Sequence, residues 1–338
     1  MRAIAERAGV TRQTVSLAMR DHRSLPAETR RRIQALAREM GYRPNPLFTA
    51  LMEHVREGKP KTNLATIAYV TAHPTRDGWR KRGNIHLEYF AGASERAKQR
   101  GYRLEEFWAR EEGMTGRRAS TILLTRNIRG LLLAPVIQPR GHLSLDWPQF
   151  AVATLGYSVW RPNVHRVVVN HFHMTNTAFR RLQKLGYRRI GLILERRVNE
   201  RTDHFYTAAF LDCQLRVPRT NRIAPLLLDK WDERTIRKWL ERNRPDAIVT
   251  HYNGILQWIR SCGLRVPQDV GVVHLSQSET KPGWACIDVK GPVVGAAGMD
   301  LVIEQLQRNE FGIPTHPQIV MIEPSWVDGE TVRTRRRL

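Results

Sequence analysis

The side chains best suited to recognise a nucleic acid lie near the N-terminus. They are Arg12, Gln13, Thr14 and Ser16. A guanidinium can pair with guanine and a carboxamide with adenine, each through two hydrogen bonds, and hydroxyls bind bases or phosphates. The first 46 residues also hold ten arginines against four acidic residues, an excess of six positive charges. This segment therefore predicts contact with a polyanion, although the polar surface of an ordinary helical scaffold is the alternative interpretation.

Three short helical patterns must position these side chains. The spacing predicts helices over residues 2–8 and about 12–19, and a third that starts near Pro26 and ends at Gly41. Gly9 supplies the turn between the first two helices, and Thr11 is a suitable N-cap for the second. The residues expected to face inward are Ile4, Ala5, Ala8, Val10, Val15, Ala18, Met19, Ile33, Leu36, Ala37 and Met40. Helix, glycine turn and helix form the layout of a helix-turn-helix, whose second helix enters the major groove.

A short linker follows this head. Pro44 and Pro46 separate the head from the run LFTALMEHVREGKPK, which is apolar on one side. An isolated helix of this length is marginal in water, so we expect it to order only against another surface. Packing of the linker on the rest of the chain is the alternative.

In the remainder of the chain, apolar runs alternate with helical patterns, which predicts parallel sheets covered by helices on both faces. Two series indicate two lobes. The first has strands at 64–71, 102–107, 130–134 and 150–155, with a helix at 85–100. The second has strands at 166–170, 189–194, 223–228, 246–250 and 270–275, with helices at 172–185, 203–215, 232–243 and 253–262. A helix near 293–309 and a strand near 318–323 are assigned to the first lobe.

Composition narrows the class of protein. The 338 residues carry a formal net charge of +23, which favours a polyanionic partner. The three cysteines, Cys213, Cys262 and Cys286, form no disulfide or metal-binding pattern. With no signal peptide and no apolar run of membrane-spanning length, we expect a soluble, cytoplasmic protein with no membrane partner.

Catalytic and metal-binding patterns are missing from the sequence. His171 and His173 stand two residues apart, but no carboxylate or cysteine nearby completes a set of metal ligands. No GxGxxG, GxxxxGK[ST] or GxSxG pattern occurs, and the Ser, His and Asp residues show no triad spacing. We therefore expect no enzyme activity, no cofactor and no metal.

Several runs closely resemble one family. The head runs AIAERAGVTRQTVSLAMR and PAETRRRIQALAREMGYRPNP are similar to the head of the lactose-repressor (LacI/GalR) family. The body runs IRGLLLAP, RRLQKLGYRRIGLI, RPDAIVT, GLRVPQDVGVVHL and WVDGETVR resemble the same family. The resemblance implies an α/β protein with an all-α helix-turn-helix head. Its two-lobed body would look like a periplasmic binding protein, with parallel sheets and three crossover strands.

The resemblance also implies a domain plan. The head covers 1–46, a hinge helix and linker 47–61, the effector-binding and dimerisation body 62–328, and a basic tail 329–338. Within the body, lobe 1 is expected at about 62–162 and 291–328, and lobe 2 at about 163–290. In the family, a hinge leucine is wedged into the minor groove, and Leu51 corresponds to it by position. The candidate DNA-binding residues are Thr11, Arg12, Gln13, Thr14, Ser16, Arg20, Tyr42, Asn45 and Leu51.

The effector site is where the sequence departs from the family. Glu200 stands at the position of a frequent arginine, Tyr252-Asn253 at that of Asn-Asp, and Leu275-Ser276-Gln277 at that of Phe-Asp-Asp. Two acids that usually hold sugar hydroxyls are therefore missing. The candidate effector-binding residues are His73, Trp79, Asn170, Arg201, Asn253 and Gln277. Trp79, Trp160 and Trp284 fall in predicted loops, where they would either stack on an apolar sugar face or pack within the protein.

Together these features predict a dimeric transcription regulator, most simply a repressor. It would bind a pseudo-palindromic operator in double-stranded DNA and respond to a small molecule, such as a sugar, held between two lobes. Two alternatives stay open. One is a DNA-binding homodimer whose body senses no ligand, and the other is a sugar-processing enzyme with a nucleic-acid-binding head.

Overall fold

The computed structural model describes residues 2–19, 25–40, 65–80, 84–278 and 282–335, without the side chains of Arg2, Ala3, Arg12, Ser16 and Arg38. The chain folds as two compact units, residues 1–63 and 64–338. The predicted hinge at 47–61 lies outside the described residues.

The first unit contains three helices, α1 (Arg2–Ala8), α2 (Arg12–Met19) and α3 (Ala27–Glu39). Gly9 links the first two with a φ of +66°, a conformation that glycine adopts without steric cost. A small apolar core joins the helices, and the expected inward residues form it, with Leu25 added and Leu36 half-buried. Val15 and Ile33 are fully buried, and burial of each side chain contributes roughly 1.5–3 kcal/mol to the free energy of unfolding.

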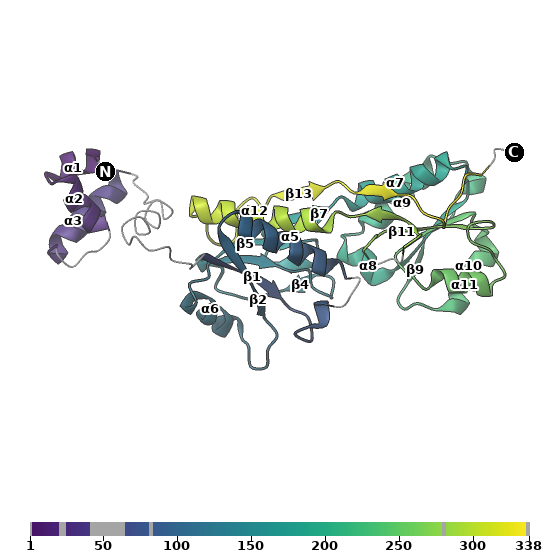
Figure 1. Cartoon of the computed structure of the whole chain (residues 1–338), viewed down its shortest axis with the longest axis horizontal. Coiled ribbons are helices and arrows are strands. Elements are labelled where there is room, and N and C mark those ends of the chain that lie inside the picture. The colour runs from purple at the N-terminus through teal and green to yellow at the C-terminus, as the bar shows by residue number, and fades with distance from the viewer. Residues whose placement is uncertain (1, 20–24, 41–64, 81–83, 279–281, 336–338) are drawn as a thin grey trace. The chain divides into compact units, whose positions relative to one another are not determined.

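Two six-stranded sheets form the second unit (Figure 1). The first sheet has the order β13-β7-β5-β3-β1-β2 and is entirely parallel. Its strands are β1 (Ala65–Thr71), β2 (Tyr102–Trp108), β3 (Gly130–Leu133), β5 (Ala151–Leu155), β7 (His165–Val169) and β13 (Ile319–Ile322). A separate two-stranded ribbon pairs β4 (Gly141–His142) with β6 (Val159–Arg161).

The second sheet has the order β14-β12-β11-β10-β8-β9. Its strands are β8 (Ile190–Glu195), β9 (Leu226–Leu228), β10 (Ala247–Thr250), β11 (Gly271–His274), β12 (Ala285–Asp288) and β14 (Ser325–Val327). All neighbours run parallel except β14, which pairs antiparallel with β12. The predicted class, α/β with parallel sheets in two lobes, is confirmed, with one antiparallel edge strand added.

Helices cover both faces of each sheet, as parallel sheets require. On the first sheet, α5 (Ile85–Gln99) and α12 (Gly291–Arg308) pack over one face and α6 (Gly116–Thr125) over the other. The alternation of β1 explains this, because Ile67 and Tyr69 join one apolar cluster while Ala68 and Val70 join the other. Three single-turn 3₁₀ helices, η1 (Gly78–Arg80), η2 (Trp147–Gln149) and η3 (Arg219–Asn221), lie in connections.

The second sheet is covered in the same way. Helices α7 (His171–Lys184) and α9 (Phe205–Leu215) contribute to the apolar cluster on one face. Helices α10 (Glu233–Asn243) and α11 (Ile255–Ser261) contribute to the cluster on the other. The short α8 (Arg196–Arg201) follows β8 directly.

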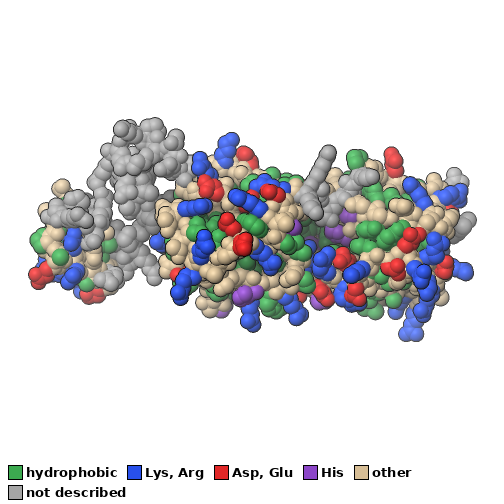
Figure 2. Space-filling view, turned by 90° about the horizontal axis from the view of Figure 1, so that it is seen from below, with side chains coloured by type: hydrophobic (Ala, Val, Ile, Leu, Met, Phe, Trp, Pro, Cys, Tyr) green, Lys and Arg blue, Asp and Glu red, His purple; other side chains and the backbone are tan. Residues whose placement is uncertain are grey.

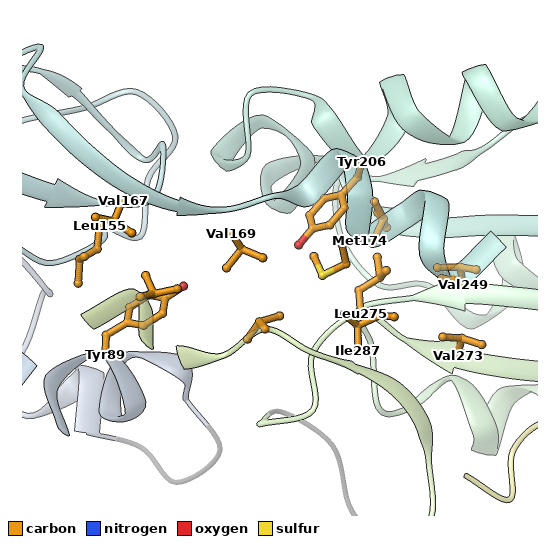
Figure 3. Close-up of a cluster of buried hydrophobic side chains, with 14 of the residues drawn as sticks. Tyr89, Leu155, Val167, Val169, Met174, Tyr206, Val249, Val273, Leu275 and Ile287 are labelled. Atoms are coloured by element: carbon orange, nitrogen blue, oxygen red, sulfur yellow. The ribbon is translucent and has the colours of Figure 1, made fainter. Parts of the chain in front are cut away.

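The chain passes between the lobes three times, after β7, after β12 and after β13. One apolar cluster runs through these crossings, from Tyr89 and Leu155 past Val169 to Met174 and Leu275 (Figure 3). The three crossover strands that the resemblance implies are therefore present. The core that lies between them is continuous from one lobe to the other.

Two assignments of strands to lobes were wrong. The strand expected at 166–170 was assigned to the second series, but β7 pairs with β5 and β13 in the first sheet. Residues 291–328 were assigned wholly to the first lobe, yet β14 lies in the second sheet. Both strands adjoin crossings, and an apolar run does not reveal which of two buried sheets receives it.

Candidate functional site

The exposed start of α2 is held by its cap and by the core beneath it. The Thr14 N–H donates to Thr11 Oγ1 (3.1 Å), so Thr11 is the N-cap that the sequence predicted. Val15 and Ala18 are fully buried, while Gln13 is exposed one turn away from them. Gln34 Nε2 of α3 donates to the Ala18 carbonyl oxygen (2.8 Å) and fixes the other end of α2. The first turn of α2 is thus a capped platform for polar side chains, packed on the core of the head.

The structure brings together only part of the predicted DNA-binding set. Thr11, Gln13 and Thr14 share the first turn of α2. The backbone of Arg12 and Ser16 belongs to the same helix, while their side chains lie outside the description. The remaining candidates, Arg20, Tyr42, Asn45 and Leu51, lie outside the described residues.

None of the six candidate effector residues is among the described residues that line the interlobe pocket characterised below. His73 follows β1, and its carbonyl oxygen accepts from the indole N–H of Trp108 (2.9 Å). Asn170 caps α7 by accepting from His173 N–H (3.0 Å), and its amide donates to Glu323 (2.8 Å). Arg201 ends α8. Asn253 and Gln277 are exposed in the loops after β10 and β11.

The three tryptophans expected in loops differ in their surroundings. Trp79, in η1, is only 1% exposed, and its indole N–H donates to Glu106 Oε1 (2.6 Å). Trp284 is 7% exposed. Both therefore pack within the protein and offer no open ring face. Trp160, on β6, is 50% exposed and lines a pocket.

This pocket, of about 590 Å³, lies between the two lobes. Its volume falls within the range of small-molecule sites, roughly 300–1,000 Å³. Figure 2 shows the body hollowed where its lobes meet, with basic, acidic and histidine side chains gathered there. The lining residues are Pro139, Arg140, Tyr157, Trp160, Arg161, Asn163, Arg166, Glu200, Asp203, His204 and Ile319.

The walls of the pocket carry opposite charges. Arg140, Arg161 and Arg166 come from lobe 1, and Glu200 and Asp203 come from lobe 2 at the α8–α9 turn. Arg166 is buried, and its guanidinium donates to the Val159 carbonyl oxygen and to Asn163 Oδ1, both at 3.4 Å. Burial lowers the pKa of Arg166 below its usual value, while Tyr157 and Asp203 act in the opposite direction.

A second polar group is a chain of histidine and aromatic rings, which runs from His171 at the start of α7 to His251 and His274 at the ends of β10 and β11. The ring of His171 packs edge-on against that of Tyr206, with ring centroids 5.0 Å apart. The ring centroids of His251 and His274 lie 5.2 Å apart. Burial, with a smaller effect of His251, lowers the pKa of His171 from 6.5 to about 3. His171 is therefore neutral at physiological pH.

Among the described residues, no three His, Cys, Asp or Glu side chains gather closely enough to hold a metal ion. No helix in the described part of the chain has the length and apolar character to cross a bilayer.

Sequence reasoning missed most of the pocket. Arg140, Arg161 and Arg166 are separated by other residues and follow no motif. One signal was available: WRPNVHR places two arginines beside an exposed tryptophan, just before a buried strand. Charged and aromatic residues at the edge of a predicted strand favour a binding surface, but the partner residues on the α8–α9 turn could not be paired with them from sequence.

Two family models match the chain. Residues 1–45 match "Bacterial regulatory proteins, lacI family", and residues 179–332 match a periplasmic binding protein-like domain. No curated protein sequence matches the chain.

Solved structures of similar fold span nearly the whole chain. A transcriptional regulator CelR–cellobiose complex is 20% identical, covers 97% of this chain and 98% of its own, and has a TM-score of 0.58. The lac repressor dimer bound to operator and the anti-inducer ONPF is 20% identical, covers 98% of each chain, and has a TM-score of 0.57. A LacI family regulator from Weissella paramesenteroides with bound glucose is 17% identical over 80% of this chain and 98% of its own, with a TM-score of 0.54. At these identities the likeness establishes the fold.

Proposed function

This chain belongs to the lacI family of bacterial regulatory proteins, and from that premise we propose that it is a DNA-binding transcription regulator controlled by a small molecule. The observation that carries the proposal is the capped first turn of α2, which presents Gln13 next to Thr11 and Thr14. A helix of this kind reads base edges in the major groove.

The head, 1–46, provides the DNA contacts in this proposal. Gln13 pairs with adenine and Arg12 with guanine, each through two hydrogen bonds. Thr11, Thr14, Ser16, Arg20, Tyr42 and Asn45 hold phosphates or bases. Residues 47–61 form the hinge, and Leu51 enters the minor groove, where an apolar wedge kinks DNA.

The body binds the effector between its lobes. It comprises 62–328 and also residues 329–335, which were wrongly predicted to belong to a tail: Thr331 Oγ1 donates to the Val272 carbonyl oxygen of lobe 2 (2.6 Å). The pocket of about 590 Å³ is lined from both lobes, so its occupant contacts both and favours one lobe arrangement over another. Two of the similar structures hold cellobiose and glucose, which supports a carbohydrate effector. The presence of this pocket favours a sensing body over one that only dimerises. The protein is a regulator and not an enzyme, and it works in the cytoplasm, where its DNA lies.

We also propose that the chain acts as a homodimer, because the similar lac repressor binds its operator as a dimer. An exposed apolar patch suits this role: Leu211 and Leu215 of α9 are 51% and 70% exposed and lie beside Ile223 and Ala224. When this patch packs against the same patch of a second chain, apolar surface is removed from water.

Selection of bound DNA from random duplexes tests the function. The full chain should enrich a pseudo-palindrome whose half-sites lie about one helical turn apart. Binding should weaken steeply with added salt, because arginine contacts to phosphates release counterions. Recovery of no common sequence would contradict the proposal.

A further inference from the structure

Three arginines on one wall of the interlobe pocket form no ion pair with the described residues, although Asp203 on the opposite wall acts electrostatically on Arg166. Arg140, Arg161 and Arg166 form no ion pair with a carboxylate of the described residues. Glu200 and Asp203 stand on the opposite wall, so the pocket holds three guanidinium groups against two carboxylates. A guanidinium pairs best with a carboxylate or phosphate, through two parallel hydrogen bonds. The lobe 1 wall is therefore suited to an anionic group.

Aromatic rings accompany the arginines. The Arg140 guanidinium lies 5.4 Å from the centroid of the half-exposed Trp160 ring, and that of Arg166 lies 5.8 Å from the Tyr157 ring. An aromatic face offers an apolar surface against which a flat or ring-shaped ligand packs. The same wall can thus hold an anionic group and the carbon skeleton attached to it.

The lobe 2 wall is built from hydrogen-bonding groups in an uncommon backbone conformation. Asp203 and His204 are consecutive and both left-handed, with φ of +52° and +63°. Non-glycine residues rarely adopt this conformation, and it concentrates at functional sites. The buried Asn199 holds the turn, because its Oδ1 accepts from Thr207 N–H (3.2 Å) and its Nδ2 lies 3.1 Å from His204 Nδ1.

This contact sets the hydrogen bonding of His204. An amide nitrogen can only donate, so Nδ1 of His204 accepts and the proton of the neutral ring lies on Nε2. The wall therefore offers two carboxylates as acceptors and one imidazole donor. Hydroxyl groups are the natural partners of such acceptors, since each donates one hydrogen bond without adding charge.

We propose that the interlobe pocket binds a polyhydroxylated anion, a monosaccharide carrying a carboxylate or a phosphate, in preference to the neutral sugar. The anionic group pairs with Arg140, Arg161 and Arg166, the ring packs on Trp160, and hydroxyls donate to Glu200 and Asp203. The inference rests on the proposed effector function and names its ligand class. It also explains how the lobes couple, since one ligand contacts the cationic wall of lobe 1 and the acidic wall of lobe 2.

Isothermal titration of the full chain tests the ligand class. Glucose, galactose and mannose are each titrated as the neutral hexose, the uronate and the 6-phosphate, with inorganic phosphate as a further probe. At least one uronate or hexose 6-phosphate should bind about tenfold or more tightly than its neutral hexose, because it adds a charge-assisted bidentate pair. The uronate and phosphate arms show which anionic group is used.

Variants locate the site. Arg140→Gln with Arg161→Gln should weaken binding of the anion about tenfold or more, and both residues are exposed, so the fold should persist. The matched control is Arg117→Gln, an exposed arginine of α6 in the same lobe that does not line the pocket and should leave affinity unchanged. An equal effect of the control variant would overturn the assignment.

Three results would overturn the inference: equal binding of neutral and anionic sugars, equal binding of inorganic phosphate, or no binding of any anion at about 10 mM, a weaker affinity than such contacts provide. DNA selection with the same preparation separates the two proposals. An enriched duplex without anion binding would refute only the ligand class, whereas failure to enrich any sequence would refute the regulator itself.

Discussion

His171 lies at the first crossing between the lobes, where it begins α7 shortly after the end of β7. Its Nδ1 is buried and has no hydrogen-bond partner among the described residues. Protonation there would place an unpaired charge away from water, which explains why burial holds the pKa of this histidine at about 3.

The depressed pKa of His171 predicts a loss of stability in acid. Between pH 6.5 and about 3 the unfolded chain binds a proton that the folded chain does not, so the free energy of unfolding falls as pH is lowered through this window. The slope reaches at most about 1.4 kcal/mol per pH unit and is smaller where water contacts the ring. Chemical denaturation at pH 7 and pH 5 measures it.

A matched pair of variants isolates this effect. His171→Gln removes the titrating group and should reduce the difference between pH 7 and pH 5. His142→Gln, an exposed histidine of lobe 1, should leave it unchanged. If His171→Gln kept the full dependence on pH, another group would be responsible.

Substitution of Gln13 tests base recognition by the head, and substitution of Thr11 tests the stability of α2. Gln13→Ala removes an exposed side chain, so it should leave stability unchanged but cost about 1–3 kcal/mol of discrimination between the preferred duplex and one altered at a single base pair. Fluorescence anisotropy with both duplexes measures this difference. Equal discrimination by the variant and the wild type would remove Gln13 from the base-reading set.

Thr11→Ala should weaken α2 itself, besides removing one of the proposed DNA contacts. It removes the acceptor of the Thr14 N–H and should cost about 1 kcal/mol of helix stability. Hydrogen exchange at the amides of α2 should accelerate, whereas Gln13→Ala should leave those rates as they are. Unchanged exchange in Thr11→Ala would mean that the cap contributes nothing.

At the scale of elements, α5 and α12 approach each other unusually closely. A Cβ added at Gly295 would lie 2.0 Å from the Tyr89 carbonyl oxygen, so no larger residue fits without displacing a helix. Asp300 of α12 also lies within 3.6 Å of Arg96 and 3.4 Å of Arg100 on α5. This pair of helices covers one face of the first sheet, so its spacing determines how that face is packed.

Gly295→Val should therefore destabilise the first lobe by about 1–3 kcal/mol, the usual cost of overpacking. Thermal unfolding of the full chain, followed by circular dichroism, measures it. Val293→Ala, at a half-exposed position of the same helix, should change the midpoint little. A midpoint of Gly295→Val equal to wild type would show that the helices separate at no cost.

Most of the longer elements were predictable, because they have a periodic signal of their own, whereas α6, β12 and β14 were not predicted. The run GLLLA predicted β3, and the strict spacing in the head predicted α1 to α3. The lobe that receives β7 or β14 was not predictable, since either sheet buries an apolar strand equally well. The charged pocket was also beyond sequence reasoning, because Arg166 and Asp203 line one pocket only through the arrangement of the two lobes.

At the scale of the whole molecule, the apolar patch on α9 is the proposed interface of the homodimer. Leu215→Glu together with Leu211→Glu places charges on the patch and should convert the dimer to a monomer, with a large loss of DNA affinity since only one head then binds. Sedimentation equilibrium measures the mass. Ile313→Glu, at an exposed apolar residue of a lobe 1 loop, is the control and should stay dimeric. A dimer that persists in the double variant would place the interface elsewhere.

The central claim is that two copies of α2 are presented to one DNA site by a symmetric pair of chains. Equilibrium titration of the full chain tests it, with the enriched duplex and a version in which one half-site is scrambled. We predict tight binding of the intact site and a loss of affinity of about a hundredfold or more for the half-site, because each good set of base contacts contributes several kcal/mol. Equal affinity for the two duplexes, or saturation by a single chain, would contradict the account.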